Sequence, residues 1–462
     1  MNRLKRFWSD LRASLWFLPS LIVAVSIALA VALIEAESAE SKQWLARWPR
    51  LFGAGAAGAR GMLSTIAGSM MTVMGVTFSM TLVTLALASS QYTSRILRNF
   101  MRDRVTQVVL GIFAGIFTYC LIVLRTIRGG DEGGYVPSLA VFFGVVLAIG
   151  GISVLIFFIH HIASSIQASS IIASVAEETM VAVDRLFPDR LGQGPVDDDE
   201  DQARLALSGR IWQGVRANGN GYIHSVDHAA LLRLAREHKT IVRMEHGIGD
   251  FVVQDTPLAS LALKDPPGKE IIVALQAAYS SSRHRTMQQD SAFGIRQIVD
   301  MALRALSPSV NDTTTAVMCV DYLTAILARL ASRDIPSSHR YEDGELRVIA
   351  VGQTFASLVA ESFDQMRGNA TGNVAIMSRM LGSLQTIASL TTSQSRRQAL
   401  REQVQWIAEL AERTIESPHD RARVESRLAR VREALETAPV LFAQAKTDNH
   451  DHVNTAQPLA KG

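Results

Sequence analysis

The chain has 462 residues, of which 48% are hydrophobic and only 19% charged, with 13 prolines, 31 glycines and two cysteines. A soluble domain ordinarily has about 25% charged residues, so at least one part of this chain is expected to lie in lipid. The same composition excludes a disordered chain, a collagen-like repeat and a disulfide-stabilised scaffold.

Charge is divided along the chain. Residues 1–160 contain 14 Lys and Arg against 7 Asp and Glu, a net charge of +7, and the other residues contain 32 against 36, a net charge of −4. The C-terminal part therefore has no basic excess of the kind that indicates nucleic-acid binding.

Four stretches near the N-terminus lack Asp, Glu, Lys and Arg altogether: 14–34, 61–94, 105–124 and 133–159. About 20 apolar residues of helix cross a hydrocarbon core roughly 30 Å thick. A spanning segment in lipid is helical, because an open strand would leave its backbone groups unpaired. The sequence therefore predicts a polytopic α-helical membrane protein with a four-helix transmembrane domain over residues 1–160.

Basic residues set the expected orientation of these spans. The first apolar run exceeds the roughly 7–15 residues of a signal-peptide core, so a retained anchor is favoured. Four basic residues precede this run and four more lie in the short segment 95–104. By the positive-inside rule both segments are cytoplasmic, which predicts a multi-pass protein with both termini in the cytoplasm.

The second span carries a stripe of small and hydroxyl residues that fall within about 80° of one another at 100° per residue. The stripe consists of Gly61, Ser64, Gly68, Thr72, Gly75 and Ser79. Close helix packing explains such a stripe, because small residues let backbones approach. The alternative is a pore or substrate path between the subunits of an oligomer. No charged side chain occupies the middle of a span, which favours a passive path or a structural bundle over an ion-coupled transporter.

Three arginines share a helical face where the second span is expected to leave the membrane: Arg95, Arg98 and Arg102. Anionic headgroups attract such residues by about 1 kcal/mol each. The functional alternative is an electropositive vestibule that concentrates anions around an oligomer axis.

No residue pattern in the sequence indicates a metal, a cofactor or a catalytic centre. His160 and His161 close the fourth span, but neighbouring helical side chains point about 100° apart and cannot share one metal; interfacial polarity or a pH-responsive gate are the two interpretations. Cys120 lies in a span and Cys319 in a predicted helix. A Gly-rich phosphate loop and a nucleophile elbow are both lacking, so an enzyme is not expected.

The part after the fourth span is expected to be cytosolic. We expect a helical extension and an acidic linker over 161–204, a small α+β module over 205–265 with a turn at Asn218-Gly219, and a helical bundle over 266–437. Its helices are predicted at 267–281, 291–306, 312–332, 353–367, 373–390, 396–416 and 419–437. Residues 438–462 are expected to be disordered.

One corner of this bundle combines an arginine-rich helix face with a polar turn: Arg296, Asp300, Arg304, Ser307, Asn311 and Asp312. Ion pairs on the helix surface explain the first three residues. Asn311 or Asp312 is a natural N-cap for the next helix. Because a helix N-terminus also attracts anions, a ligand corner is the alternative to a structural one.

Two segments resemble the signature regions of a family of bacterial predicted membrane proteins that is known mainly as a domain of unknown function. They are SSQYTSRILRNFMRDRVTQVVLG (89–111) and DSAFGIRQIVDMALRALSPSVNDTTTA (290–316). The resemblance covers residues 10–435 and implies a protein of the bacterial inner membrane. Its N-terminal half would have four spans and its C-terminal half would be soluble. Where the family tends to have Asn-Asp-Pro, Thr313 follows Asp312, so the corner has one more backbone donor to satisfy.

Two functions compete at this point. The first is a homo-oligomeric channel or passive transport pathway, lined by the second span and gated by the cytosolic part. The second is a non-conducting membrane-anchored scaffold or sensor whose cytosolic part binds a protein or a small ligand. The expected partners are the lipid bilayer and further copies of the chain, and no nucleic acid.

Overall fold

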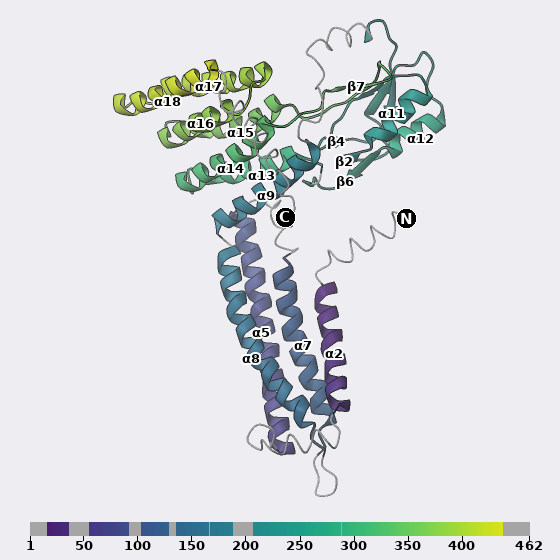
Figure 1. Ribbon diagram of the computed structural model, residues 1–462, viewed down its shortest axis with the longest axis vertical. Coiled ribbons are helices and arrows are strands. Elements are labelled where there is room, and N and C mark those ends of the chain that lie inside the picture. The colour runs from purple at the N-terminus through teal and green to yellow at the C-terminus, as the bar shows by residue number, and fades with distance from the viewer. Residues whose placement is uncertain are drawn as a thin grey trace, which may run out of the picture. The chain divides into compact units, whose positions relative to one another are not determined.

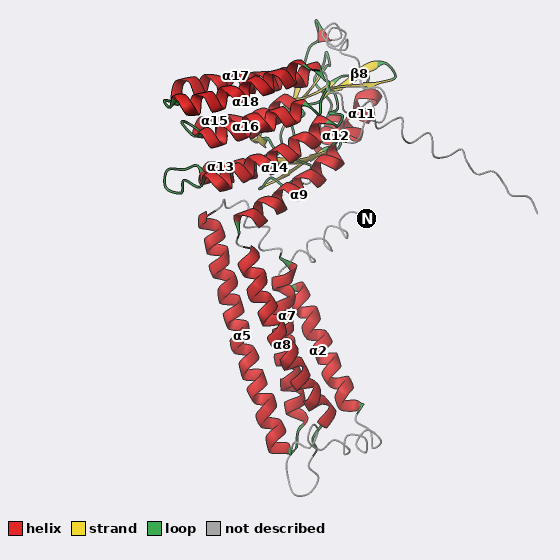
Figure 2. Ribbon diagram, turned by 60° about the vertical axis from the view of Figure 1, so that its left-hand side comes forward, coloured by secondary structure: helices red, strands yellow, loops and turns green. Residues whose placement is uncertain are grey.

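The computed structural model describes residues 16–36, 55–91, 103–128, 135–165, 167–187, 207–287 and 289–437. The chain divides into two compact units, residues 1–170 and 171–462. The first unit is helical, and the second contains both helices and strands (Figures 1 and 2). The acidic run predicted as a linker and the predicted disordered tail lie outside the described residues.

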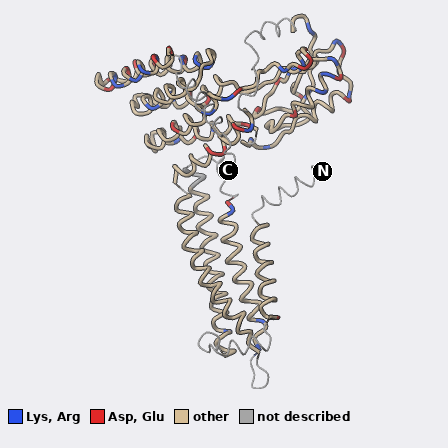
Figure 3. The backbone as a smooth tube through the Cα atoms, viewed as in Figure 1, with Lys and Arg blue, Asp and Glu red and all other residues tan. Residues whose placement is uncertain are grey.

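The described part of the first unit consists of long apolar helices. They are α2 (Phe17–Glu35), α5 (Ala56–Gln91), α7 (Arg104–Thr126) and α8 (Ser138–Ser165). Helix α7 packs against each of the other three. Between their ends these helices are almost free of charge, whereas both signs are spread over the second unit (Figure 3). All four are long and apolar enough to cross a membrane, and so is α14 (Thr313–Ala331) of the second unit.

Large side chains fill the interior of the first unit. Leu63, Phe113, Tyr119 and Phe158 are each fully buried. The Tyr119 hydroxyl donates a hydrogen bond of 2.7 Å to the carbonyl oxygen of Ala140, so even the polar end of this ring is satisfied. The described residues thus enclose a packed core and not an open path.

Glycines on α7 and α8 permit this packing. A Cβ added to Gly115 would lie 2.5 Å from Oγ of Ser26, and one added to Gly111 would lie 2.7 Å from the side chain of Ile22. A Cβ on Gly144 would meet a leucine side chain at 2.9 Å. These are the close backbone approaches that small residues provide in helix bundles of membrane proteins.

The sequence predicts that the fourth apolar helix continues beyond the span, but in the structure this helix is interrupted. Helix α8 ends at Ser165 and a separate helix, α9 (Ala168–Leu186), begins three residues later. The Ser164 and Ser165 hydroxyls donate to the carbonyl oxygens four residues earlier, at 3.0 and 2.7 Å. Such bonds compete with the helical ladder and favour a bend or an end.

The second unit contains two small sheets. The five-stranded sheet has the order β1-β5-β3-β8-β7, and the three-stranded sheet has the order β4-β2-β6. The strands are β1 (Gln213–Arg216), β2 (Gly221–Val226), β3 (Val242–Met244), β4 (Phe251–Val252), β5 (Pro257–Leu261), β6 (Tyr279–Ser282), β7 (His339–Glu342) and β8 (Glu345–Ile349). All pairs are antiparallel except β3 and β8, where Val242 lies opposite Val348.

This α+β region draws on more of the chain than the sequence indicates. Helices α11 (His228–Glu237) and α12 (Lys269–Ala277) pack against strands, with Leu231, Leu261 and Leu275 in a common core. Three of the strands, β6 to β8, come from beyond residue 265, where only helices are predicted. The predicted helix 267–281 ends early because its last residues form β6, which pairs with β2 more than 50 positions earlier.

The remaining helices form two layers. Within a layer, each helix packs against the helix that lies two places further along the chain. These helices are α13 (Ser291–Ala305), α14, α15 (Phe355–Asn369), α16 (Val374–Ala388), α17 (Gln394–Thr414) and α18 (Pro418–Glu436). Helix α15 packs against α13 and α17, while α16 packs against α14 and α18. All six agree with predicted helices to within a few residues, because each carries a strong 3.6-residue apolar period.

Candidate functional site

Helix α5 has two different faces. One face packs into the core through Ala59, Leu63, Ala67 and Met70, none more than 6% exposed. The stripe predicted from the sequence lies on the other side, and all six of its members are exposed: Gly61, Ser64, Gly68, Thr72, Gly75 and Ser79. The structure therefore keeps the stripe together but turns it away from the chain's own described helices.

The stripe glycines have no neighbours. A Cβ added to Gly61, Gly68 or Gly75 would find no heavy atom within 4 Å. Glycines on α7, by contrast, meet side chains well inside van der Waals distance. Packing among the described residues therefore accounts for the small residues of α7 but not for those of α5.

Threonine hydroxyl groups along α5 donate to carbonyl oxygens of their own helix. Thr72 donates to the carbonyl oxygen of Gly68 at 3.1 Å, and Thr65 donates to that of Gly61 at 2.8 Å. A hydroxyl that donates in this way tolerates lipid and still offers its lone pairs to a donor. The exposed face can thus receive a close-packed helix or line a polar path.

The arginines predicted as a basic vestibule, Arg95, Arg98 and Arg102, lie outside the described residues. The next described residue, Asp103, caps the start of α7 and accepts a hydrogen bond of 2.7 Å from the Thr106 hydroxyl. Its Oδ2 also lies 2.9 Å from Nε2 of His161. Burial opposes the charge on Asp103, but the hydrogen bonds from Thr106 and His161 outweigh it and lower its pKa. The sequence singles out His161 but not this carboxylate partner.

The arginine-rich face of α13 joins two helices. Arg296 donates from Nε to Asp300 at 2.9 Å and reaches α15 at Glu361 and Gln365, at 3.3 and 3.0 Å. Arg304 is exposed. The structure thus brings Arg296 and Asp300 into one network across α13 and α15.

The polar turn after α13 is a capped helix junction. The Ser307 hydroxyl donates to the carbonyl oxygen of Arg304 at 2.7 Å, and Asn311 adopts a left-handed backbone with φ of 48°. Asp312 caps α14 by accepting from the amide of Thr315 at 3.0 Å. Hydrogen bonds from Thr315 hold the pKa of Asp312 below its usual range.

Thr313, where the family tends to have proline, has a partner of its own. Nδ2 of Asn373 donates to the Thr313 hydroxyl at 3.2 Å, while Oδ1 of Asn373 accepts from the amide of Ile376 and caps α16. The hydroxyl therefore ties the start of α14 to the start of α16. This contact gives the corner a structural explanation.

A buried cluster that the sequence does not indicate lies at the start of α13. Asp290 is only 2% exposed, forms an ion pair of 2.7 Å with Arg285, and accepts from the Gln353 amide at 3.1 Å. Gln353 in turn accepts from the Ser291 hydroxyl at 2.7 Å. Burial raises the pKa of Asp290, although Arg285 opposes this. The cap pattern could have found Asp290, but its partner Gln353 lies 63 positions further along the chain.

The described residues contain no group of three or more His, Cys, Asp and Glu side chains that could hold a metal ion. Both cysteines are buried and free. Burial raises the pKa of Cys319 to about 12, which leaves this thiol protonated and unreactive at neutral pH.

Comparison with known proteins identifies relatives but gives no activity. Uncharacterized proteins of Mycobacterium tuberculosis (strain ATCC 25618 / H37Rv) and of Mycobacterium bovis are each 32% identical over 460 residues, covering 97% of this chain and 85% of theirs. No solved structure matches the chain significantly. The family described as "Predicted membrane protein (DUF2254)" matches residues 12–386. The chain therefore belongs to this family of membrane proteins.

Proposed function

We propose that this protein is a homo-oligomer of the bacterial inner membrane whose copies associate through the exposed stripe of α5 and enclose a passive pathway. Helices α2, α5, α7 and α8 are its four spans, and both termini are cytoplasmic. Helix α14 is assigned to the soluble part because it carries ion-paired Asp321 and Arg329 and packs between α13 and α16. The proposal includes no enzymatic activity.

The orientation of the α5 stripe carries the proposal. Glycine is a poor choice for a helix that simply faces lipid, because it adds no apolar contact and costs about 0.5–1 kcal/mol relative to alanine. Gly61, Gly68 and Gly75 face away from the other described helices, and no described heavy atom lies within 4 Å of a Cβ placed there. A second copy of α5 could approach closely at these positions, as small-residue interfaces in membranes do.

A pathway between copies is favoured over one within a single copy. The interior of the first unit is filled by Phe113, Tyr119 and Phe158, so a single chain offers no water-filled route in its described residues. The exposed hydroxyls of Ser64 and Ser79 would line the space between copies. Mid-span charges are absent from the sequence, which favours passive movement over coupling to protons or ions.

Association is tested with bulky residues on the stripe. A Cβ at position 68 or 75 would meet no heavy atom of the described residues within 4 Å, so the fold should survive Gly68→Ile or Gly75→Ile while association is lost. Ser69→Ile is the matched control, because Ser69 is exposed but points about 100° away from Gly68. Light scattering in detergent should give an oligomer for wild type and Ser69→Ile and a monomer for the stripe variants. A monomeric wild type in detergent and in nanodiscs would refute the proposal.

Conduction is tested separately on the same variants in liposomes. Wild-type protein should support ion flux that Gly68→Ile abolishes and Ser69→Ile retains. If the oligomer forms but passes no ions under voltage, tension or a pH step, the pathway is refuted and the oligomer stands.

A non-conducting scaffold or sensor is the second candidate. Phe251 is the first residue of the short edge strand β4, and Val253 follows its last residue. Their side chains are 52% and 50% exposed. An edge strand with exposed apolar side chains is a recurrent docking element for protein partners. If this function holds, the full chain should retain a defined partner that Phe251→Glu releases, while assembly in detergent is unchanged.

A further inference from the structure

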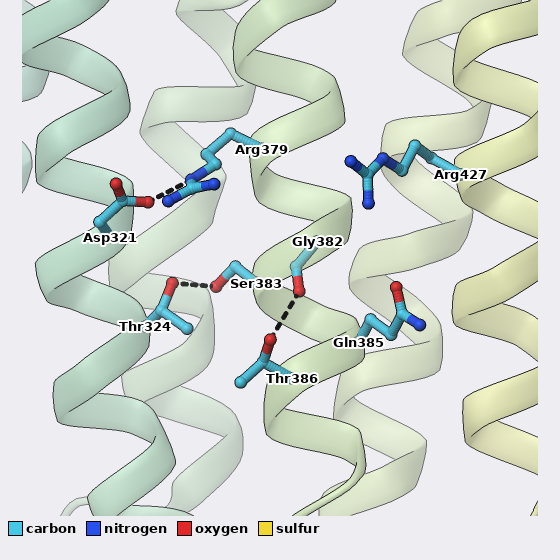
Figure 4. Close-up of a pocket in the computed structure, with 8 residues that line it drawn as sticks. All are labelled: Asp321, Thr324, Arg379, Gly382, Ser383, Gln385, Thr386 and Arg427. Atoms are coloured by element: carbon cyan, nitrogen blue, oxygen red, sulfur yellow. Dashed lines mark hydrogen bonds and ion pairs between the residues drawn. The ribbon is translucent and has the colours of Figure 1, made fainter.

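A polar pocket of about 470 Å³ opens between α14, α16 and α18 in the helical layers of the second unit (Figure 4). Its volume is within the range of about 300–1,000 Å³ that is typical of small-molecule sites. Asp321 lines it from α14, Arg379 from α16 and Arg427 from α18. All of its walls belong to one compact unit.

The two arginines are in different states. Arg379 forms an ion pair through Nε with Asp321, which fixes one edge of its guanidinium group. Arg427 is half-buried, and among the described residues no acceptor receives a hydrogen bond from it and no carboxylate lies within 4 Å of it. In Figure 4 its guanidinium group points from α18 towards α16. The charged groups that line the pocket sum to one net positive charge.

The hydroxyl groups that line the pocket already have hydrogen-bond partners. The Thr324 hydroxyl is 2.6 Å from the carbonyl oxygen of Val320 and 2.6 Å from the Ser383 hydroxyl, so the two hydroxyl protons are used in these two hydrogen bonds. Thr386 donates to the carbonyl oxygen of Gly382 at 3.1 Å. The donors left for a ligand are therefore the guanidinium group of Arg427, the second edge of Arg379 and the side-chain amide of Gln385.

Gly382 keeps the middle of the pocket open. It lies inside α16, where glycine is less stable than alanine. A Cβ at this position would meet no heavy atom within 4 Å, and its φ is not in the left-handed region. Neither close packing nor backbone geometry requires glycine. In Figure 4 it lies between the Arg379 side and the Arg427 side, where a side chain would occupy the open space.

We propose that this pocket binds a small oxyanion, a molecule carrying a phosphate or carboxylate group, between Arg427 and Arg379. The planar guanidinium group presents paired donors that match two oxygens of such a group. Asp321 acts as a positioning residue, because it holds Arg379 and does not face the ligand with a free carboxylate. A metal ion is disfavoured, since this single carboxylate is already paired. The site is independent of whether the membrane unit conducts.

The test is calorimetric titration of the full-length protein in detergent with sodium pyrophosphate and, separately, with sodium citrate. Sodium chloride at matched ionic strength is the blank. Arg427→Gln should weaken binding at least about tenfold, because a hydrogen bond to a charged group is lost. Arg432→Gln is the matched control, an exposed arginine five residues further along α18 that does not line the pocket. Pyrophosphate binding alone identifies a phosphate ligand, and citrate binding alone identifies a carboxylate ligand.

Gly382→Met separates loss of binding from loss of folding. Methionine favours a helix interior more than glycine does, and its Cβ would meet no heavy atom within 4 Å. This variant should lose anion binding while its thermal unfolding midpoint stays equal or rises. The proposal is overturned if neither anion binds, if sodium chloride reproduces the signal, if Arg427→Gln and Arg432→Gln bind alike, or if Gly382→Met binds as wild type does.

Discussion

Replacement of Gly249 should be damaging although it adds only a methyl group. Its φ is 93°, and an added Cβ would lie 2.5 Å from Oδ2 of Asp290 and 2.8 Å from Nη2 of Arg285. Asp290 is buried and held by Gln353 as well, so the pair has little room to retreat. We expect Gly249→Ala to lower the free energy of unfolding by about 2–3 kcal/mol, measured by thermal unfolding of the full chain.

Gly344 is the control for this substitution. Its φ of 77° imposes a similar backbone strain, but a Cβ there would meet no atom within 4 Å. Gly344→Ala should therefore cost only about 1 kcal/mol. Equal losses for the two variants would show that backbone strain, and not the buried ion pair, accounts for the effect at Gly249.

Asp184 gives a pH-dependent prediction. Its carboxylate accepts from Nη2 of Arg329 at 2.5 Å and from Nη2 of Arg333 at 2.9 Å, which fastens α9 to α14. The hydrogen bond from Arg329 holds the pKa of Asp184 below its usual range. A lowered folded-state pKa stabilises the fold fully above the unfolded-state pKa, near 3.9, and this stabilisation is lost as the pH falls through the folded-state value.

Asp184→Asn should therefore lower the unfolding free energy by about 1 kcal/mol at pH 7, or roughly 2–4 °C in the midpoint, a modest effect because the pair is partly exposed. The difference from wild type should shrink between pH 4 and pH 3. Glu425→Gln removes an exposed carboxylate that has no hydrogen-bond partner among the described residues, and it should change little at either pH. A pH-independent difference would contradict the ion-pair explanation.

At the scale of elements, α13 approaches α9 closely at Gly294. A Cβ on Gly294 would fall 2.0 Å from Oγ1 and 2.8 Å from Cγ2 of Thr179, which is itself fully buried. Gly294→Ala should therefore separate the two helices and cost about 2–3 kcal/mol, despite the better helix propensity of alanine. Thermal unfolding of the full chain measures this loss.

A double-mutant cycle identifies the contact responsible. Thr179→Ala removes both atoms that clash most, so the double variant should recover part of the loss, with a coupling energy of about 1–2 kcal/mol. Gly368→Ala in α15, where a Cβ meets nothing within 4 Å, should be neutral or stabilising. Strict additivity of the Gly294 and Thr179 effects would refute the packing explanation.

Elements differ in how well the sequence predicts them. The helices α13 to α18 lie within a few residues of their predicted positions, since each has an apolar period and five have a side-chain cap, such as Asp312 or Asn373, at the start. Strands β6 and β8 are missed because each is short and pairs with a strand far along the chain, and β7 is a short strand that pairs with the neighbouring β8. The α5 stripe is visible in the sequence, but only packing shows that Leu63 and Met70 are buried instead. No local pattern links Asp321, Arg379 and Arg427.

The whole molecule combines two kinds of interior. In the first unit the core is made by apolar rings such as Phe113 and by glycines that admit neighbouring helices. In the second, buried ion pairs such as Arg285–Asp290 accompany the apolar contacts. Charged side chains are therefore at the ends of the helices in the first unit, whereas in the second unit they also lie between helices and strands. This contrast is what a chain partitioned between lipid and water requires.

Membrane topology provides the prediction at this largest scale, and the native cysteines make it practical. Cys120 and Cys319 are both fully buried, so the wild-type chain should react little with a membrane-impermeant maleimide. Gly55→Cys, at the exposed start of α5, and Asp265→Cys, at an exposed position of the α+β region, each add one accessible thiol.

With both termini in the cytoplasm and four spans, position 55 lies outside the inner membrane and position 265 inside. In intact spheroplasts the reagent should therefore label Gly55→Cys and spare Asp265→Cys, and after lysis it should label both. Labelling of both positions in intact spheroplasts would contradict the assigned topology, because an odd number of spans must separate residue 55 from residue 265. Helix α14 follows both positions, so Glu436→Cys, exposed at the end of α18, tests it: labelling from outside would make α14 a fifth span.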